Sequence, residues 1–316
     1  MSQLPRLPIN QAHVVQQFTR RSPLDAAQFL YGEIAQRMLQ RLSYIRIAPK
    51  DILDAGCGAG HALDPLRARY PELNYTGLDA CDALLKVAQT RYVSKPGFWH
   101  KLRNKPTPAL HFIQADLADS SLPDQSMDLV WSNLALHWHP EPHVVLSEWR
   151  RILKSDALVM FSSLGPGTFK ELRTAIEAAG LTTNTMEFVD MHDFGDLMLR
   201  TGFSDPVMDQ EIITLTYRTA EKLLEDLRDL GGNPRSDRKA GLSGRAWRAR
   251  LIQALERQRH ADGTIHLSLE VAYGHAWRAT VRRGPLGDLP VTTFKRSKAL
   301  DPNAPPPRVR PRTPEE

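Results

Sequence analysis

Apolar residues follow two different periods along this chain of 316 residues. Over residues 11–47 they recur every three to four positions, which predicts an N-terminal helix ending before Pro49. Its apolar stripe consists of Phe29, Ile34, Met38, Leu42 and Ile45. Short apolar runs and helical stretches then alternate. The predicted strands are Asp51–Ala55, Tyr75–Asp79, Leu110–Gln114, Met127–Ser132 and Ala157–Ser162, and the predicted helices are Ala62–Arg69, Ala83–Tyr92, Pro142–Leu153 and Phe169–Ala179.

The pattern changes after Gly180. We expect a helix at Phe188–Thr201, a strand at Ile212–Tyr217, helices at Glu221–Leu230 and Gly244–Gln258, and a last strand at Thr264–Trp277. Alternating strands and helices need right-handed crossovers and a sheet covered on both faces. The predicted fold is therefore α/β, a Rossmann-like doubly wound sheet of seven strands. It is mostly parallel, with an antiparallel last strand and a helical excursion before it.

Three parts of the chain follow from this pattern. Residues 1–48 form an N-terminal helical segment or lid, and residues 49–280 form the main domain, in which 218–262 are a helical excursion that caps the substrate side. Residues 281–316 form a basic, proline-rich tail whose composition predicts disorder. Within the main domain, Thr168 and Glu171 have the spacing of a capping box at the start of a helix.

Composition and charge narrow the class of protein. The net charge is +5, but residues 95–105 carry +4 and residues 292–316 carry +3, so the remainder is slightly acidic and no nucleic-acid partner is expected. No apolar run is long enough to span a membrane and the N-terminus lacks a signal core, so we expect a cytoplasmic protein without membrane contact. In that setting Cys57 and Cys81, the two cysteines of the chain, should be reduced.

The most informative stretch runs from Asp54 to Gly60 and follows an apolar strand. Glycines let the backbone approach a bound nucleotide closely, and here they stand at Gly56, Gly58 and Gly60, with Cys57 among them. Dinucleotide sites space their glycines differently and place a helix N-terminus at a pyrophosphate. An anionic Asp54 would repel phosphates but attract the cationic amino-acid portion of S-adenosylmethionine.

Further cofactor-binding candidates follow the next strands. Asp79, which is 19 residues beyond Gly60, can accept hydrogen bonds from ribose hydroxyls, and Ala80 follows it. Polar and apolar groups at two later strand ends could contact the adenine and the methionine portion: Asp116, Leu117, Asn133 and Leu134. Asp116 could equally be a turn-forming residue. Asn133 is followed by Leu134 rather than by Pro-Pro and an aromatic residue, which disfavours amino methylation of nucleic-acid bases.

His137, Trp138, His139 and His143 suggest a metal site at first, but no cysteine or carboxylate cluster completes a ligand set and the spacing does not fit one helical face. We therefore expect no metal. His137 could act as a general base, since an ordinary histidine pKa suits that role, and Trp138 could line the substrate pocket. A purely packed His137–Trp138 pair explains the same residues.

These motifs resemble class I S-adenosylmethionine-dependent methyltransferases, and specifically the malonyl-acyl-carrier-protein O-methyltransferases of biotin synthesis. The resemblance covers about residues 14–277. It is carried by Leu53–Gly58, by Asp128–Ala135, by Gly167–Leu172 and by Asp226–Asn233. In the N-terminal segment, Phe18-Thr19-Arg20-Arg21 keeps the start of the family pattern and then departs from it at Ser22. That start is also similar to a mitochondrial arginine hydroxylase that assembles respiratory complex I.

The resemblance implies methyl transfer to the free carboxylate of a malonyl group on acyl carrier protein. It implies that an arginine holds this carboxylate, with Arg20 and Arg21 as the candidates. The acidic carrier would suit a basic face of the helical excursion, formed by Arg235, Arg238, Lys239 and Arg245. The alternatives are methylation of another small carboxylate, hydroxylation or assembly work on a protein arginine, and a cofactor-binding chaperone without turnover.

Overall fold

The computed structural model describes residues 6–93, 108–238, 244–279, 281–284 and 287–290, the last two stretches as backbone only. The chain divides into two units, Met1–Ala279 and Thr280–Glu316. In the second unit, β8 (Val281–Gly284) and β9 (Gly287–Pro290) form an antiparallel hairpin, where the sequence pattern predicts disorder. The remainder of the predicted tail lies outside the described residues, as does the basic stretch 95–105.

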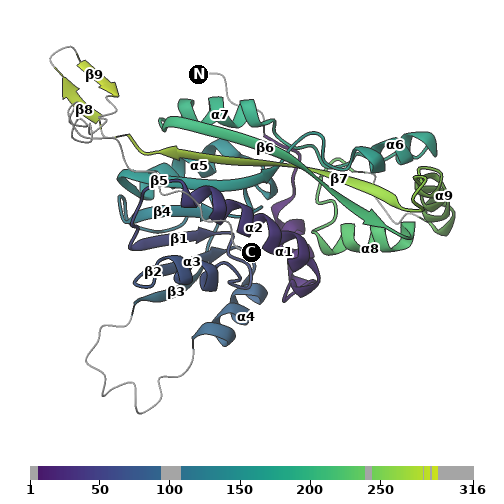
Figure 1. Ribbon diagram of the computed structural model, residues 1–316, viewed down its shortest axis with the longest axis horizontal. Helices are drawn as coiled ribbons and strands as arrows, with labels where there is room; N and C mark the ends of the chain where they lie inside the picture. Colours follow the sequence, from purple (N-terminus) through teal and green to yellow (C-terminus); the bar gives the residue numbers. More distant parts are fainter. Residues whose placement is uncertain (1–5, 94–107, 239–243, 280, 285–286, 291–316) are drawn as a thin grey trace, which may run out of the picture. The chain divides into compact units, whose positions relative to one another are not determined.

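A seven-stranded sheet is the centre of the first unit (Figure 1). Its strand order is β3-β2-β1-β4-β5-β7-β6. Strands β1 to β5 pair in parallel, and β7 is antiparallel to both neighbours. This confirms the predicted fold class, with the antiparallel strand inserted between β5 and β6. The bounds are β1 Asp51–Ala55, β2 Asn74–Asp79, β3 Leu110–Gln114, β4 Met127–Ser132, β5 Leu153–Leu164, β6 Ser204–Tyr217 and β7 Ile265–Trp277.

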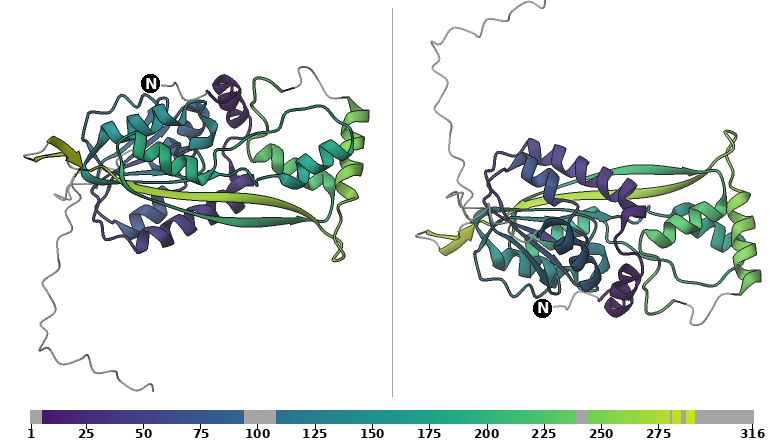
Figure 2. Two further views of the ribbon diagram at one scale, coloured as in Figure 1. Left: turned by 90° about the horizontal axis from the view of Figure 1, so that it is seen from above. Right: turned by 90° about the horizontal axis from the view of Figure 1, so that it is seen from below.

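Helices cover both faces of this sheet (Figure 2). On one face α2 and α3 pack against side chains such as Ile52 and Trp131, and on the other α5 and α7 pack against Leu53 and Val130. Their bounds are α2 Gln28–Ser43, α3 Leu63–Arg69, α5 Pro142–Ile152 and α7 Met191–Arg200, and α4 spans Asp82–Tyr92. No helix in the described part of the chain combines the length and the apolar character that a membrane crossing requires.

The helical excursion lies at the far end of the long strands β6 and β7 (Figure 1). It consists of α8 (Ala220–Asp229) and α9 (Arg245–Glu256), and α6 (Lys170–Ala178) lies beside them. These helices have an apolar core of their own, in which Leu223 and Leu255 are buried against Leu267 of β7. The excursion is thus packed against β7, a strand of the central sheet.

The N-terminal segment is two helices rather than one. Helix α1 (Gln11–Thr19) is separated from α2 by a turn and a 3-10 segment, η1 (Asp25–Ala27). Pro23 lacks a backbone N–H and Leu24 takes a left-handed conformation, with φ 71°, so the helix cannot continue. The buried stripe of α2 is Leu30, Ile34, Met38 and Leu42, while Phe29 of the predicted stripe is 48% exposed.

The predicted capping box is wrong. Helix α6 begins at Lys170, and its first residues turn towards β7 instead of capping each other. Thr168 donates its hydroxyl to the main-chain oxygen of Glu270 and accepts from the Glu270 N–H. The carboxylate of Glu171 accepts from the hydroxyl and N–H of Ser268. Thr168 and Glu171 have the spacing of a capping box, but strand β7, about 100 residues along the chain, provides hydrogen-bond partners for both side chains, so they do not cap the helix.

Candidate active site

The glycine-rich turn after β1 makes a close approach that no side chain could share. Gly56 has φ +80°, and a Cβ built on it would lie 2.2 Å from the Cβ of Ala135. The N–H groups of Gly56 and Cys57 both donate to the main-chain oxygen of Leu78, at 2.7 and 3.0 Å. Gly58 also has a positive φ, of +54°. The turn therefore packs tightly against Ala135 and Leu78 at the carboxyl ends of β1 and β2, and only glycine allows this close approach at Gly56.

Asp54 lies at the end of β1 and is only 2% exposed. Its carboxylate accepts a hydrogen bond of 2.5 Å from the hydroxyl of Tyr75 on β2. Burial raises the pKa of Asp54 to about 7, and the neighbouring Asp79 adds to the rise while the Tyr75 hydrogen bond opposes it. A cationic group bound here would be held by a carboxylate that is otherwise poorly solvated.

Asp79 ends β2 and faces the same turn. Its two carboxylate oxygens accept from the N–H groups of Gly58, at 2.9 Å, and Cys81, at 2.8 Å. Burial raises the pKa of Asp79, and these hydrogen bonds oppose the rise. Because each carboxylate oxygen has a second lone pair, Asp79 can still accept from the hydroxyls of a ribose. Cys57 and Cys81, next to it, are both free thiols, as predicted.

The loop after β3 is tied to the N-terminal helix through Asp116. Gln11 of α1 donates to one carboxylate oxygen of Asp116 at 2.8 Å, and the Nε2 of His139 lies 3.1 Å from the other. The His139 hydrogen bond is the largest cause of a lowered pKa for Asp116. His139 also accepts at Nδ1 from the N–H of Glu141, so its remaining proton is on Nε2, facing Asp116.

Asn133 ends β4, and its side chain is used inside the protein. Its amide donates to the main-chain oxygen of Tyr31 at 2.9 Å and accepts from the hydroxyl of Ser162 at 2.9 Å. The same hydroxyl accepts from the N–H of Leu134, which has φ 52°. The side chain of Asn133 therefore joins α2 to β4 and β5, and one amide N–H and one oxygen lone pair remain for other contacts.

Two cavities adjoin at this edge of the sheet. The first has about 540 Å³ and is lined by the glycine turn, the strand ends and α1 and α2, including most of the predicted cofactor residues: Asp54, Gly56, Cys57, Gly58, Asp79, Ala80, Asp116, Leu117, Asn133 and Leu134. Gly60 lines neither cavity; it closes the turn, where its N–H donates to the main-chain oxygen of Cys57. We refer to this first cavity, of about 540 Å³, as the cofactor cavity.

The second, the acceptor cavity, has about 600 Å³ and lies between α1, α2 and the helical excursion. It is lined by the predicted substrate residues Arg20, Arg21 and Trp138 and by His137, the predicted general base. Three residues line both cavities: Tyr31, Leu134 and Trp138. They form a shared wall, so the two cavities lie side by side.

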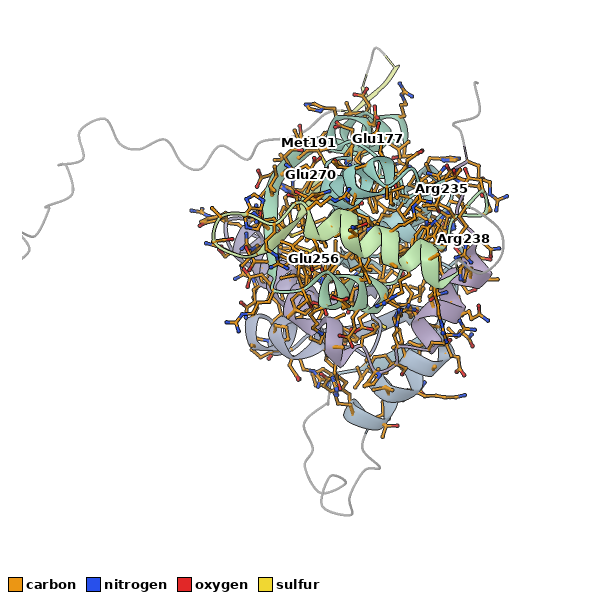
Figure 3. All side chains as sticks on the ribbon, turned by 90° about the vertical axis from the view of Figure 1, so that its right-hand side faces the viewer. Glu177, Met191, Arg235, Arg238, Glu256 and Glu270 are labelled. Carbon is orange, nitrogen blue, oxygen red and sulfur yellow. The ribbon has the colours of Figure 1, made fainter. Side chains whose placement is uncertain are left out.

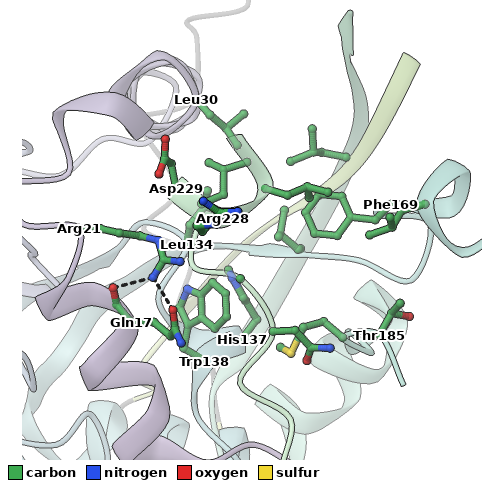
Figure 4. Close-up of a pocket in the computed structure, with 18 of the residues that line it drawn as sticks. Gln17, Arg21, Leu30, Leu134, His137, Trp138, Phe169, Thr185, Arg228 and Asp229 are labelled. Carbon is green, nitrogen blue, oxygen red and sulfur yellow. Dashed lines mark hydrogen bonds between the residues drawn. The ribbon is translucent and has the colours of Figure 1, made fainter. Parts of the chain in front are cut away.

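Arg21 extends from the N-terminal segment towards the acceptor cavity (Figure 4). Its guanidinium donates to the main-chain and side-chain oxygens of Gln17, at 2.7 and 2.6 Å. Burial lowers the pKa of Arg21, and the charge of Asp229 opposes that effect, so the side chain stays cationic in a poorly solvated place. This is a suitable environment for an anionic ligand.

His137 is 5% exposed and lies in the short 3-10 helix Leu136–Trp138. Burial lowers its pKa to about 3, so the imidazole is neutral at physiological pH. Its ring lies 4.8 Å from that of Trp138 and 5.6 Å from that of Phe188, between centroids. His137 is therefore a packed neutral donor or acceptor at the cavity wall and a very weak base.

The predicted basic face of the helical excursion is only partly present. Arg235 is 6% exposed and pairs with Asp237 at 2.7 Å and Glu187 at 2.9 Å, so it is not available on the surface. Arg238 is exposed and lines the acceptor cavity, and Figure 3 shows it beside Arg235. Arg245 is exposed at the start of α9, and Lys239 lies outside the described residues.

Sequence reasoning did not identify several residues that build the site. Tyr31 of the shared wall donates its hydroxyl to the main-chain oxygen of Leu230. Gln11 and His139 both contact Asp116 in the loop after β3, the former across 105 residues, and Gln17 holds Arg21. No local motif marks them. Among the described residues, no group of three or more histidine, cysteine, aspartate or glutamate side chains is arranged to hold a metal ion.

Comparisons with known proteins agree with this geometry. A methyltransferase-domain family model matches residues 53–161. The chain is 42% identical to the malonyl-[acyl-carrier protein] O-methyltransferase of Laribacter hongkongensis over 260 residues, which is 82% of this chain and 86% of that protein. It is 39% identical to the protein of the same name from Gallionella capsiferriformans over 263 residues, 82% of this chain and 87% of that protein.

Among solved structures, the YcgJ protein of Bacillus subtilis has the same fold, with a TM-score of 0.51 at 14% identity over 77% of this chain and 98% of that one. The cofactor is S-adenosylmethionine, and the cavity fits it: the glycine turn borders the cavity without side chains of its own at Gly56 and Gly58, and a buried carboxylate at Asp54 suits the cationic end of the cofactor. The chain is a class I S-adenosylmethionine-dependent methyltransferase and belongs to the family of malonyl-[acyl-carrier protein] O-methyltransferases.

Proposed function

We propose that this enzyme methylates the free carboxylate of a malonyl group carried on acyl carrier protein, as a step of biotin synthesis. The names of its relatives support this acceptor. The observation that carries the proposal is the wall of Tyr31, Leu134 and Trp138, at which the cofactor cavity adjoins a cavity lined by a half-buried arginine, Arg21. The two free cysteines fit a cytoplasmic setting.

In the cofactor cavity we assign each predicted residue a task. Asp54 binds the amino group of the methionine portion, Asp79 accepts from the ribose hydroxyls, and Asp116 and Leu117 contact the adenine. The main chain of Gly56, Gly58, Asn133 and Leu134 borders the remainder, together with Cys57 and Ala80. S-adenosylmethionine supplies a methyl group that is activated by its sulfonium charge.

In the acceptor cavity the chain needs to orient the carboxylate and exclude water. A carboxylate is already nucleophilic, so the reaction requires no general base, and the pKa of about 3 makes His137 unsuited to be one. We assign His137 a binding role instead. Arg21 binds the carboxylate, and holding it against the shared wall aligns its oxygen with the methyl group. Arg20 lies nearer solvent, at the mouth of the cavity.

The carrier would reach the site over the outer rim of the acceptor cavity. This rim carries Arg20, Arg228 and Arg238. Burial is the largest cause of the lowered pKa of His13 on α1, and the charges of Arg238, Arg20 and Arg21 lower it further, so these three arginines all lie near the His13 imidazole. A positive rim favours docking of an acidic protein such as acyl carrier protein.

Transfer of a labelled methyl group tests the proposal. Purified enzyme is incubated with labelled S-adenosylmethionine and malonyl-acyl carrier protein, and the intact mass of the carrier is measured. We expect a gain of one methyl group on malonyl-carrier and none on acetyl-carrier, which lacks the carboxylate. No gain by an enzyme that binds S-adenosylmethionine in calorimetry would refute the proposal. In the cell, deletion of the gene should create a requirement for biotin.

A further inference from the structure

Three residues that line the acceptor cavity each carry a buried polar atom with no hydrogen-bond partner among the described residues. These atoms are Arg21 Nε, His137 Nδ1 and Trp138 Nε1. Leaving such an atom unsatisfied costs about 1–3 kcal/mol, so native structures seldom do so without a reason. Their common position at one cavity suggests that a bound molecule supplies the missing acceptors.

The three groups are held in place by their neighbours. The Trp138 ring meets Phe18 of α1 edge-on, with centroids 5.5 Å apart, and lies so close to Gly231 that a Cβ there would be 2.7 Å from it. His137 packs between Trp138 and Phe188. Gln17 orients the guanidinium of Arg21 (Figure 4). A prearranged set of donors favours one ligand geometry over others.

The positions of the groups relative to the cofactor cavity suggest which atom each one contacts. Trp138 lines both cavities, whereas Arg21 and His137 line the acceptor cavity alone. The reacting carboxylate must lie at the shared wall, beside Trp138. A malonyl thioester has one further oxygen, on the carbonyl that is separated from the carboxylate by a single CH₂ group. This oxygen is farther from the transferred methyl, where His137 can donate.

Resting on the proposed function, we propose that Trp138 and His137 determine the acceptor: the indole N–H binds the carboxylate beside Arg21, and His137 Nδ1–H donates to the thioester carbonyl. The enzyme then selects a carboxylate with a carbonyl two bonds from the carboxyl carbon. Because the buried imidazole is neutral, it can donate this hydrogen bond without bringing a second positive charge next to Arg21.

Two acceptors separate the roles of the two residues. One is malonyl-acyl carrier protein, and the other is a carrier whose arm ends in a 2-carboxyethyl thioether, which has the same length but no carbonyl. The variants are Trp138→Phe and His137→Phe. The control is Trp247→Phe, which removes another unpartnered buried indole N–H, on α9 and outside both cavities. Calorimetry with S-adenosylhomocysteine monitors folding of the cofactor cavity.

We expect Trp138→Phe to lower kcat/KM by about 10- to 100-fold on both acceptors, as for loss of a hydrogen bond to a charged group. His137→Phe should lower the preference for malonyl over the thioether by about 3- to 10-fold. His137→Gln, which keeps an N–H donor, should recover part of it. Trp247→Phe should match the wild type.

An unchanged preference in His137→Phe would overturn the role of His137, and equal activity of Trp138→Phe and Trp247→Phe would overturn that of Trp138. If His137→Phe loses cofactor binding, His137→Gln takes its place as the test variant. The activity ratio between the two acceptors then tests the role of His137, since both activities are measured with the same protein. A wild type that methylates neither acceptor while binding the cofactor would instead refute the proposed function itself.

Discussion

If Asp54 binds the amino group of S-adenosylmethionine as proposed, the affinity for this cofactor should depend on pH. Its carboxyl group is buried, and its pKa is raised to about 7. The cationic amino group of the ligand needs the ionised form, so affinity should rise with pH through the neutral range. Replacing Asp54 by Asn removes the titrating group and keeps the shape of the side chain.

The magnitude follows from the ionised fraction. With a pKa of about 7, roughly one-tenth of the carboxyl groups are ionised at pH 6 and about three-quarters at pH 7.5, so the apparent dissociation constant should fall about eightfold between them. The amino group of the ligand, with an ordinary pKa of about 7.7–8.0, is roughly 60–75% protonated at pH 7.5, which reduces the expected net fall to about five- to sixfold. Asp54→Asn should bind more weakly by about 2–5 kcal/mol, as for truncation of one partner of a buried charge pair.

The same shift determines how stability changes in the absence of ligand. Folding raises the pKa of Asp54, so the folded protein binds this proton more tightly than the unfolded chain does. The stabilisation of the folded protein that comes from binding this proton is therefore present at about pH 4 and is lost as the pH rises through about 7. S-adenosylmethionine should restore part of that loss, and the thermal shift it produces should increase from pH 6 to pH 7.5.

Titration calorimetry at half-unit intervals from pH 6 to pH 7.5 provides the measurement. Tyr75→Phe serves as a second variant, because its hydroxyl opposes the rise in the pKa of Asp54. Its midpoint should move to higher pH. A wild-type affinity that is flat or falls over this range, or an Asp54→Asn variant with the wild-type slope, would refute the assignment of Asp54 to the amino group.

Three further substitutions test the packing of the site. Gly56→Ala places a methyl group 2.2 Å from the Cβ of Ala135, and equilibrium dialysis should show that cofactor binding is lost. Gly231→Ala, at φ +117° and 2.7 Å from the Trp138 ring, should lower the unfolding free energy by about 1–3 kcal/mol in urea titrations and reduce kcat/KM. Gln11→Ala removes the hydrogen bond from α1 to the loop after β3 and should speed cofactor release several-fold in stopped-flow experiments, with little change in thermal stability.

The parts of the fold that follow from local pattern were predictable. Strands such as Leu110–Gln114 and Met127–Ser132 have the predicted bounds, because short apolar runs between turns have few alternatives in an α/β chain. The glycine turn was predictable because Gly56, Gly58 and Gly60 directly follow one of these strands. In contrast, the continuous helix over residues 11–47 was wrong, because apolar spacing continues across a break that Pro23 and Leu24 impose.

Site residues could be predicted where they lie at the end of a predicted strand. They could not be predicted where the site is formed by segments far apart in the sequence. Asp54 and Asp79 could be predicted because each lies at the end of a predicted strand. Tyr31 lies within α2, where no sequence motif indicates that it reaches the site. Arg235 was assigned to the surface because an arginine in a polar loop is usually exposed. It is buried because Asp237 and Glu187, from two segments, neutralise its charge.

Helix α1 links the two cavities, because its residues take part in both. Val15 and Phe18 line the cofactor cavity, while Gln17 and, just beyond the helix, Arg21 line the acceptor cavity. A change in the position of this segment would therefore alter both cavities together. Since the reaction needs a poorly hydrated carboxylate in line with the methyl group, a helix that borders both cavities can exclude water from the carboxylate and from the cofactor in one arrangement.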